Sequence, residues 1–152
     1  MAAVLIRYRP CQRLAGNLAV KMNSTPYLDE IFADAHLTNL FDKFLQERFC
    51  EENLAFFRAA TAYKALSSEA ERIAAARTIF SNFIASDAQL EINIPSTTRV
   101  PLEKSIFTGA EGVFDAAIID CKRMLEWDSA PGFIAHGSYL GSRPLSFHLL
   151  SS

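Results

Sequence analysis

Three adjacent polar residues, Glu51, Glu52 and Asn53, open an apolar segment in the stretch RFCEENLAFFRAATAYK, residues 48–64. Paired carboxylates can share a proton or hold a metal ion when they face each other. On a helix, however, adjacent side chains point about 100° apart, so Glu51 and Glu52 do not form a shared-proton pair. The residues alone favour a role at a helix start, where first-turn acids stabilise the helix by roughly 0.3–1 kcal/mol each.

The patterns of phosphate binding and nucleophilic catalysis are missing from the sequence. It has neither a GxxxxGK[ST] nor a GxGxxG loop, and HGSYLGS lacks the GxSxG spacing of a nucleophile elbow. The histidines lie far apart, at His36, His136 and His148, and the cysteines include no CxxC pair. We therefore expect no cofactor, no metal site and no disulfide framework, with free thiols in a reducing compartment.

The charge is unevenly distributed along the chain. The formal net charge is −2, but residues 1–23 carry four basic residues and no acid, which leaves 11 of the 15 basic residues and all 17 acidic ones for the rest. An acidic body of this kind argues against a nucleic-acid partner. No run of 18 apolar residues is present, so the sequence predicts no membrane span.

Residues 1–25 form a basic N-terminal leader with three open interpretations. It can be flexible or weakly helical, or it can be a membrane-surface segment through residues 1–22, with Cys11 as a candidate palmitoylation site. A transit peptide is the third interpretation, because the leader contains arginine and lacks acids.

Apolar spacing predicts helices along most of the chain after Pro26, beginning with a short one over residues 27–33. The next stripe has the i, i+3, i+4, i+7, i+8 spacing of one helix face and consists of Leu37, Leu40, Phe41, Phe44 and Leu45. In the segment after Glu51, apolar residues mark two faces, Leu54 and Phe57 on one and Phe56 and Tyr63 on the other. We expect that helix to be buried on more than one side.

The second half of the chain also reads as helical. An alanine-rich helix starts near Glu69, residues 87–98 read as a connection, and Pro101 suits the first turn of the next helix. The last long stripe consists of Phe114, Ala117, Ile118, Cys121 and Leu125. Asp128 and Ser129 are N-cap types for a short helix ending near His136. LEINI is the only strand candidate and is short, so the pattern predicts an all-α domain of about seven to nine helices.

Four separated motifs resemble, in one order, the domain of regulators of G-protein signalling (RGS). FCEENLAFFRAATAYK is similar to the family signature, and LFDKFLQERFC to the helix before it. FIASDAQLEINI resembles the segment that ends in an Asn-Leu/Ile loop, and RMLEWDSAPGFIAHGSYL resembles the LMExDSxxxFxxSxxY region. The resemblance runs from about Pro26 to Leu140, which predicts an RGS domain over residues 26–142 and a tail over 143–152.

The resemblance implies an RGS-type fold of about nine helices in two parts. Helices near 51–65, 69–85, 98–107 and 113–127 would form a four-helix bundle, and the terminal helices would pack together in a subdomain below it. The implied function is activation of the GTPase of a heterotrimeric G-protein α subunit. RGS domains supply no arginine finger and have no catalytic centre of their own; they bind the partner's switch segments in the transition-state arrangement.

The implied partner is the α subunit in its GTP-bound or transition-state form. We expect the chain to act as a monomer, in the cytoplasm or at the inner face of the plasma membrane. The residues that match the family's switch contacts are Glu52, Asn53, Asn93, Met124, Asp128 and Ser129. We expect the Asn53 side chain at the surface. Structural roles remain open for these positions: helix capping for Asn53 and Asp128, a turn for Asn93, and core packing for Met124.

Three further contact positions depart from the family pattern. Cys50 stands where the family usually has a serine that can cap the helix, and Arg48 stands at a position that is often acidic. Gly132 replaces a common arginine four residues after Asp128. These departures keep open a second function, an interaction or scaffold module that does not accelerate hydrolysis. A helical ligand-binding bundle is the unrelated alternative.

Overall fold

The computed structural model describes residues 27–142, which contain helices and connections but no strand. In chain order the helices are α1 (Tyr27–Ala33), α2 (Ala35–Glu47), α3 (Glu52–Lys64), α4 (Glu69–Ile79), α5 (Ser96–Ser105), α6 (Asp115–Met124), α7 (Ala130–Ile134) and α8 (Gly137–Ser142). Two π-helical turns, η1 (Phe80–Ile84) and η2 (Leu125–Ser129), continue α4 and α6. The predicted all-α fold is confirmed. The leader with Cys11 and the tail 143–152 lie outside the described residues.

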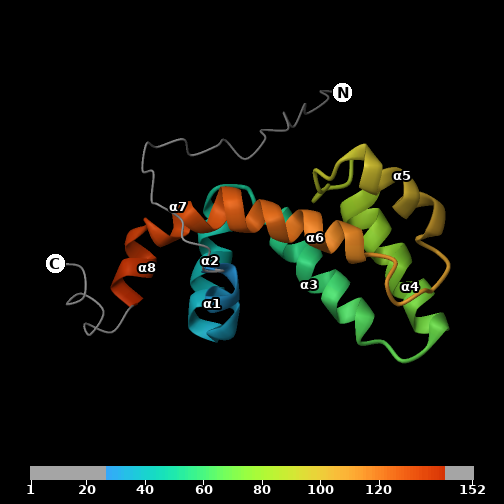
Figure 1. Cartoon of the computed structure of the whole chain (residues 1–152), viewed down its shortest axis with the longest axis horizontal. Helices are drawn as coiled ribbons and strands as arrows, with labels where there is room; N and C mark the ends of the chain where they lie inside the picture. Colours follow the sequence, from blue (N-terminus) through green and yellow to red (C-terminus); the bar gives the residue numbers. More distant parts are fainter. Residues whose placement is uncertain (1–26, 143–152) are drawn as a thin grey trace, which may run out of the picture.

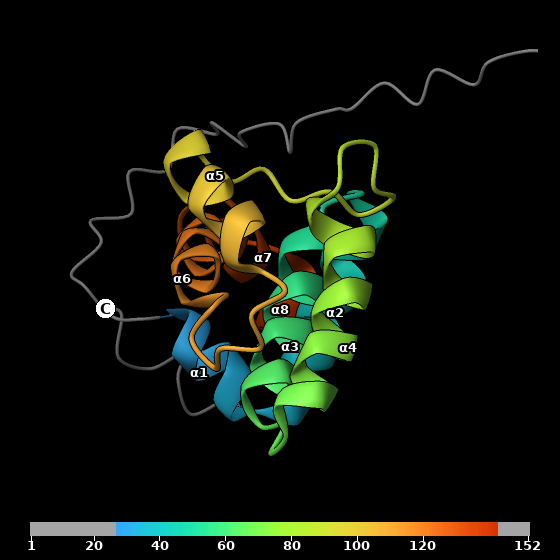
Figure 2. The same cartoon turned by 90° about the vertical axis from the view of Figure 1, so that its right-hand side faces the viewer.

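The helices divide into two groups around two hydrophobic cores. Helices α3, α4, α5 and α6 enclose the bundle core, with α3 and α4 on one side and α5 and α6 on the other (Figure 2). Helices α1, α2, α7 and α8 gather at the opposite end of the molecule around the terminal core (Figure 1). This is the arrangement of a four-helix bundle with a terminal subdomain that the resemblance implies.

Helix α3 takes part in both cores, as its two apolar faces predict. Leu54 packs in the terminal core with Leu125 of η2, whereas Phe56 and Tyr63 pack in the bundle core. Aromatic side chains fill much of the bundle core: the Phe114 ring meets the Tyr63 ring edge-on at 4.9 Å between centroids. Because α3 is anchored at both ends of the molecule, its first turn is held at the boundary between the two parts.

Local signals set several of the helix ends. The Asp34 side chain accepts hydrogen bonds from the backbone N–H groups of His36 and Leu37 and starts α2. Ser68 and Glu71 form a reciprocal capping box at the start of α4. Helix α3 differs, because its N-cap residue Glu51 makes no side-chain capping bond.

The predicted start of α5 is wrong by several residues. The helix begins at Ser96, directly after Pro95, so Pro101 lies inside it rather than in its first turn. Interior proline is unfavourable because it lacks an N–H and crowds the preceding turn. Tertiary contacts offset this cost: Leu102 is buried in the bundle core, and the Thr98 hydroxyl donates to Asp120 of α6 at 2.6 Å.

The short helix predicted after Asp128 and Ser129 is present as α7, but its N-cap residue Ser129 makes no side-chain capping bond. The chain continues from α6 through η2 into α7, so Asp128 lies within a π-helical turn and caps nothing. The backbone N–H of Ala130 bonds to the carbonyl of Leu125, a spacing of five residues. Because this turn is wider than an α-helical turn, Leu125, Ala130 and Phe133 can all face the terminal core. Packing of this inward face therefore overrides the local capping preference.

Candidate functional site

The connection between α2 and α3 exposes a large aromatic residue. Phe49 is 86% exposed and has a φ of 55°, in the left-handed region that is unfavourable for a bulky side chain. Arg48 before it is exposed and stacks over the Phe44 ring at 4.0 Å from its centroid. Cys50 after it is buried, and its Sγ donates to the Arg48 carbonyl at 3.2 Å. Arg48 and Cys50 are thus held by these contacts, while the Phe49 ring is exposed to solvent.

The first turn of α3 carries the polar residues of the signature. Glu52, the first residue of the helix, is half-buried. Asn53 is buried, with 8% of its surface exposed, so the expectation of a surface side chain is wrong. Its Nδ2 donates to Glu52 Oε1 at 3.1 Å, but its Oδ1 is buried without a partner, as is Oε2 of Glu51. Packing of α3 on two sides draws this asparagine inward.

The Glu52 carboxyl has a perturbed pKa at the start of α3, the helix that packs against α6. Burial raises the pKa of the Glu52 carboxyl above its usual range, and the neighbouring charge of Glu51 raises it further. Burial also raises the pKa of the Cys121 thiol to about 12, with contributions from Asp120 and from Glu52 across the helix interface. Helix α3 packs against α6, and Cys121 lies one turn before the end of α6.

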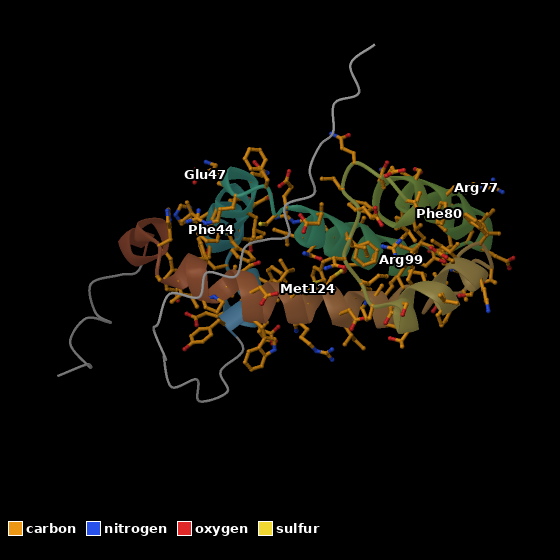
Figure 3. All side chains as sticks on the ribbon, turned by 90° about the horizontal axis from the view of Figure 1, so that it is seen from above. Phe44, Glu47, Arg77, Phe80, Arg99 and Met124 are labelled. Atoms are coloured by element: carbon orange, nitrogen blue, oxygen red, sulfur yellow. The ribbon has the colours of Figure 1, made fainter. Side chains whose placement is uncertain are left out.

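The end of α6 and η2 contribute the second part of the surface. Met124 ends α6, is half-buried and packs against the bundle core; it lies between the terminal part around Phe44 and the bundle end around Arg99 (Figure 3). Asp128 is exposed in η2, and Ser129 beside it is buried. Gly132 is half-buried in α7, in a segment that carries no basic residue between 129 and 135.

Asn93 is presented by the connection between η1 and α5. Its neighbours Ile92 and Ile94 are buried in the bundle core, so the alternation turns Asn93 outward, where it is exposed. The Ile92 backbone N–H donates to the Phe83 carbonyl at 2.9 Å, which ties the connection to η1. This connection and the one between α2 and α3 lie on the same upper side of the molecule in Figure 1.

The structure places the residues singled out from the sequence at the start of α3, at the end of α6 and in η2, and on the connection before α5. Sequence reasoning missed Phe49 and Trp127, the latter 61% exposed between Glu126 and Asp128. A large aromatic residue inside a matched motif was the available signal, but periodicity alone assigns such residues to a core. Exposed large aromatic side chains fit a protein partner.

The side chains at this surface are mainly hydrogen-bonding and apolar groups. Within residues 27–142, no cluster of three or more His, Cys, Asp or Glu side chains is arranged to hold a metal ion. The side chains offered are carboxylates, amides and apolar groups, with Arg48 as the cation. Such a set accepts hydrogen bonds from a partner's N–H groups. In the same part of the chain, none of the helices is both long and apolar enough to cross a membrane.

A family model agrees with the arrangement of the motifs. The model described as the regulator of G protein signaling domain matches residues 27–141. This range includes every described element from α1 to the penultimate residue of α8.

Several curated proteins are similar over the same region. Regulator of G-protein signaling loco from Drosophila melanogaster is 31% identical over 111 residues, which are 73% of this chain and 7% of that protein. Regulator of G-protein signaling 5 from Sus scrofa is 31% identical over 112 residues, 74% of this chain and 62% of that protein. Regulator of G-protein signaling 16 from Homo sapiens is 34% identical over 99 residues, 65% of this chain and 49% of that protein. The chain thus spans less than two thirds of the length of each of these relatives.

Proposed function

Because the chain belongs to the regulator of G protein signaling family, we propose that it is a GTPase-activating protein for a heterotrimeric G-protein α subunit. It acts by binding the mobile switch segments of the α subunit in the arrangement of the transition state. The α subunit holds its own arginine and a glutamine that orients the attacking water. The chain contributes no catalytic centre and no cofactor, and we propose that it acts as a monomer.

One observation supports this proposal: the signature helix α3 packs against α6, which continues into the acidic motif of η2. Leu54 of α3 and Leu125 of η2 belong to the same hydrophobic core. We propose that Asn53, once turned outward, Met124 and Asp128 contact one partner at once. Asn93 would add a second amide from the neighbouring connection.

The mechanism follows from differential binding. A partner that binds the transition-state arrangement more tightly than the ground state lowers the barrier by that difference in free energy. Ordering the switch segments also removes motions that take the glutamine and the water out of line. Asn93 and Asn53 suit this role because an amide donates and accepts at the same time. Asp128, exposed in η2, would accept hydrogen bonds from a switch backbone.

The single-turnover rate of GTP hydrolysis tests the proposal. A panel of α subunits is loaded with GTP, and hydrolysis is followed with and without the full chain. We expect acceleration of at least one subunit, and we expect Asn53→Ala to reduce it by more than tenfold, since a lost polar contact in the transition state costs on the order of 1.5–3 kcal/mol. Glu69→Gln, in the first turn of α4, is the matched control at another helix start.

A second function, a binding module that does not accelerate hydrolysis, is favoured by Gly132. No basic residue follows Asp128 within the next turn, so the family's usual arginine has no substitute there. In that case an α subunit would bind without faster hydrolysis, which the same assay separates from the first function.

We also propose that the chain works in the cytoplasm, at the inner face of the plasma membrane. The basic leader over residues 1–22 would supply attraction to anionic lipids. That segment lies outside the described residues.

A further inference from the structure

The Asn53 amide is half satisfied in a buried position. Its Nδ2 donates to Glu52 Oε1 at 3.1 Å, while its Oδ1 is buried and lacks a hydrogen-bond partner. Leaving a buried acceptor unpaired costs roughly 1–3 kcal/mol. Native proteins contain few such groups, and each one calls for a physical cause.

The charge of Glu52 supplies that cause. An ionised carboxylate accepts hydrogen bonds and cannot donate them, so only the Nδ2 end of the amide can face it. Turning the amide over would bring Oδ1, a second acceptor, against the carboxylate. The Nδ2–H···carboxylate bond is also charge-assisted and stronger than a neutral one. Glu52 thus fixes which end of the amide is satisfied and leaves Oδ1 unpaired.

No cation is among the described groups that act on the Glu52 carboxyl, so none competes with the Asn53 amide for it. The charge that acts on the Glu52 carboxyl is that of Glu51, next to it in the chain, and the carboxyl also accepts a hydrogen bond from its own backbone; Glu52 in turn acts on Cys121 of α6. Glu51 is another acid, and burial keeps the Cys121 thiol protonated far beyond neutral pH because its pKa is about 12.

We propose that Glu52 is a positioning residue: its ionised carboxylate holds the Asn53 amide inward in the free protein, and Asn53 reaches a partner only after this hydrogen bond breaks. The unpaired Oδ1 makes the inward state marginal, because turning outward gives this oxygen a donor. For docking, Glu52 then acts through Asn53 rather than by its own contact. This last step rests on the proposed function.

The inward state is tested without any partner. The side-chain NH₂ resonances of Asn53 are followed by proton–nitrogen NMR on the full chain across the pH range of carboxyl titration. We expect them to shift with a single midpoint above the usual Glu range, and to lose this titration in Glu52→Gln. Glu69→Gln should keep it, because Glu69 opens a different helix. Asn53 resonances that ignore pH in the wild-type chain would overturn the proposal, and this arm needs no variant.

The docking step is tested by a double-mutant cycle with an α subunit carrying GDP and aluminium fluoride. The effect of Glu52→Gln on Kd is measured in the wild-type background and again in Asn53→Ala. If Glu52 acts through Asn53, its effect falls below about twofold once Asn53 is gone. Equal effects in both backgrounds would assign Glu52 a contact of its own and refute the positioning role. If no α subunit binds, the proposed function fails, while the titration of the free protein still decides whether Glu52 holds the amide.

Discussion

Arg99 of α5 donates from Nη2 to the carbonyl oxygen of Ile92 at 2.8 Å. Helix α5 thus stabilises the connection that precedes it, between η1 and α5. The same guanidinium donates to the Ile84 carbonyl and forms an ion pair with Glu91 at 3.1 Å. These bonds hold the backbone on one side of Asn93, whose own side chain faces solvent. Arg99 therefore supports a candidate contact residue from beneath.

Arg99→Lys should loosen this connection. A lysine ammonium is a single point charge and cannot serve two carbonyls and a carboxylate as the planar guanidinium does. Losing one bond to a buried carbonyl should cost about 1–3 kcal/mol of unfolding free energy in urea titrations. Affinity for an α subunit should fall as well, because Asn93 is no longer held in place.

Arg58→Lys is the control for this substitution. Arg58 pairs with Asp42 at 2.6 Å on the surface, where an ion pair contributes less than about 1 kcal/mol. Equal losses in the two variants would show that Arg99 is only another surface charge.

Gly109→Ala should destabilise the fold. Gly109 has a φ of +72°, and an added Cβ would lie 2.6 Å from Glu69 Cγ and 3.3 Å from the Glu69 carbonyl oxygen. The backbone strain alone costs more than about 1 kcal/mol, and the short contacts add to it. The midpoint of thermal unfolding measures the effect.

Gly137→Ala is the matched control, because an added Cβ at Gly137 meets nothing within 4 Å. This variant should unfold at the wild-type temperature or slightly above it. A Gly109→Ala chain as stable as Gly137→Ala would contradict the close approach between Gly109 and α4.

Much of the fold could be predicted from apolar spacing. The stripe on α2 places Phe41, Phe44 and Leu45 in the terminal core, and the two faces of α3 join the two cores. The π-helical turn at η2 could not be predicted from the sequence. The spacing of the apolar residues after Leu125 is also compatible with an ordinary α-helix. The start of α5 was missed because its cause is tertiary: Thr98 bonds to Asp120, which is 22 residues away.

The sequence supplied candidate residues for the site but not their geometry. Resemblance supplied the positions of Asn53, Asn93 and Asp128, each from a short motif. Burial of Asn53 and exposure of Phe49 depend on how α3 packs between two cores, which a local pattern does not encode. Polar type alone therefore misplaced Asn53 at the surface.

Folding stability should depend on pH through Glu52. Burial raises its folded-state pKa, so the folded chain binds this proton more tightly than the unfolded chain does. The resulting stability is present below the unfolded-state pKa and is lost as pH rises through the folded one. Glu52→Gln lacks this loss, so its stability relative to wild type should improve between about pH 3.5 and pH 7. Urea titrations of both chains at the two pH values measure the change; a constant difference would contradict the raised pKa.

Gly132→Arg should strengthen binding to a cognate α subunit. An arginine on α7, one turn after Asp128, can steady this acid and reach the partner, which should raise affinity by about 1 kcal/mol. Gly132→Ala separates the two effects of the substitution, because alanine gains about 1 kcal/mol of helix propensity without adding a charge. Titration of both variants against the aluminium-fluoride form decides between them. An arginine variant no tighter than the alanine variant would mean that the missing charge is not the limit on binding.

The affinity of the full chain for one α subunit in three nucleotide states tests the central claim most directly. The states are GDP, a non-hydrolysable GTP analogue, and GDP with aluminium fluoride, which mimics the transition state. Differential binding predicts the tightest complex with aluminium fluoride, a weaker one with the GTP analogue and the weakest with GDP. Equal affinity for all three states would contradict the account, because a partner that binds every state alike cannot lower the barrier to hydrolysis.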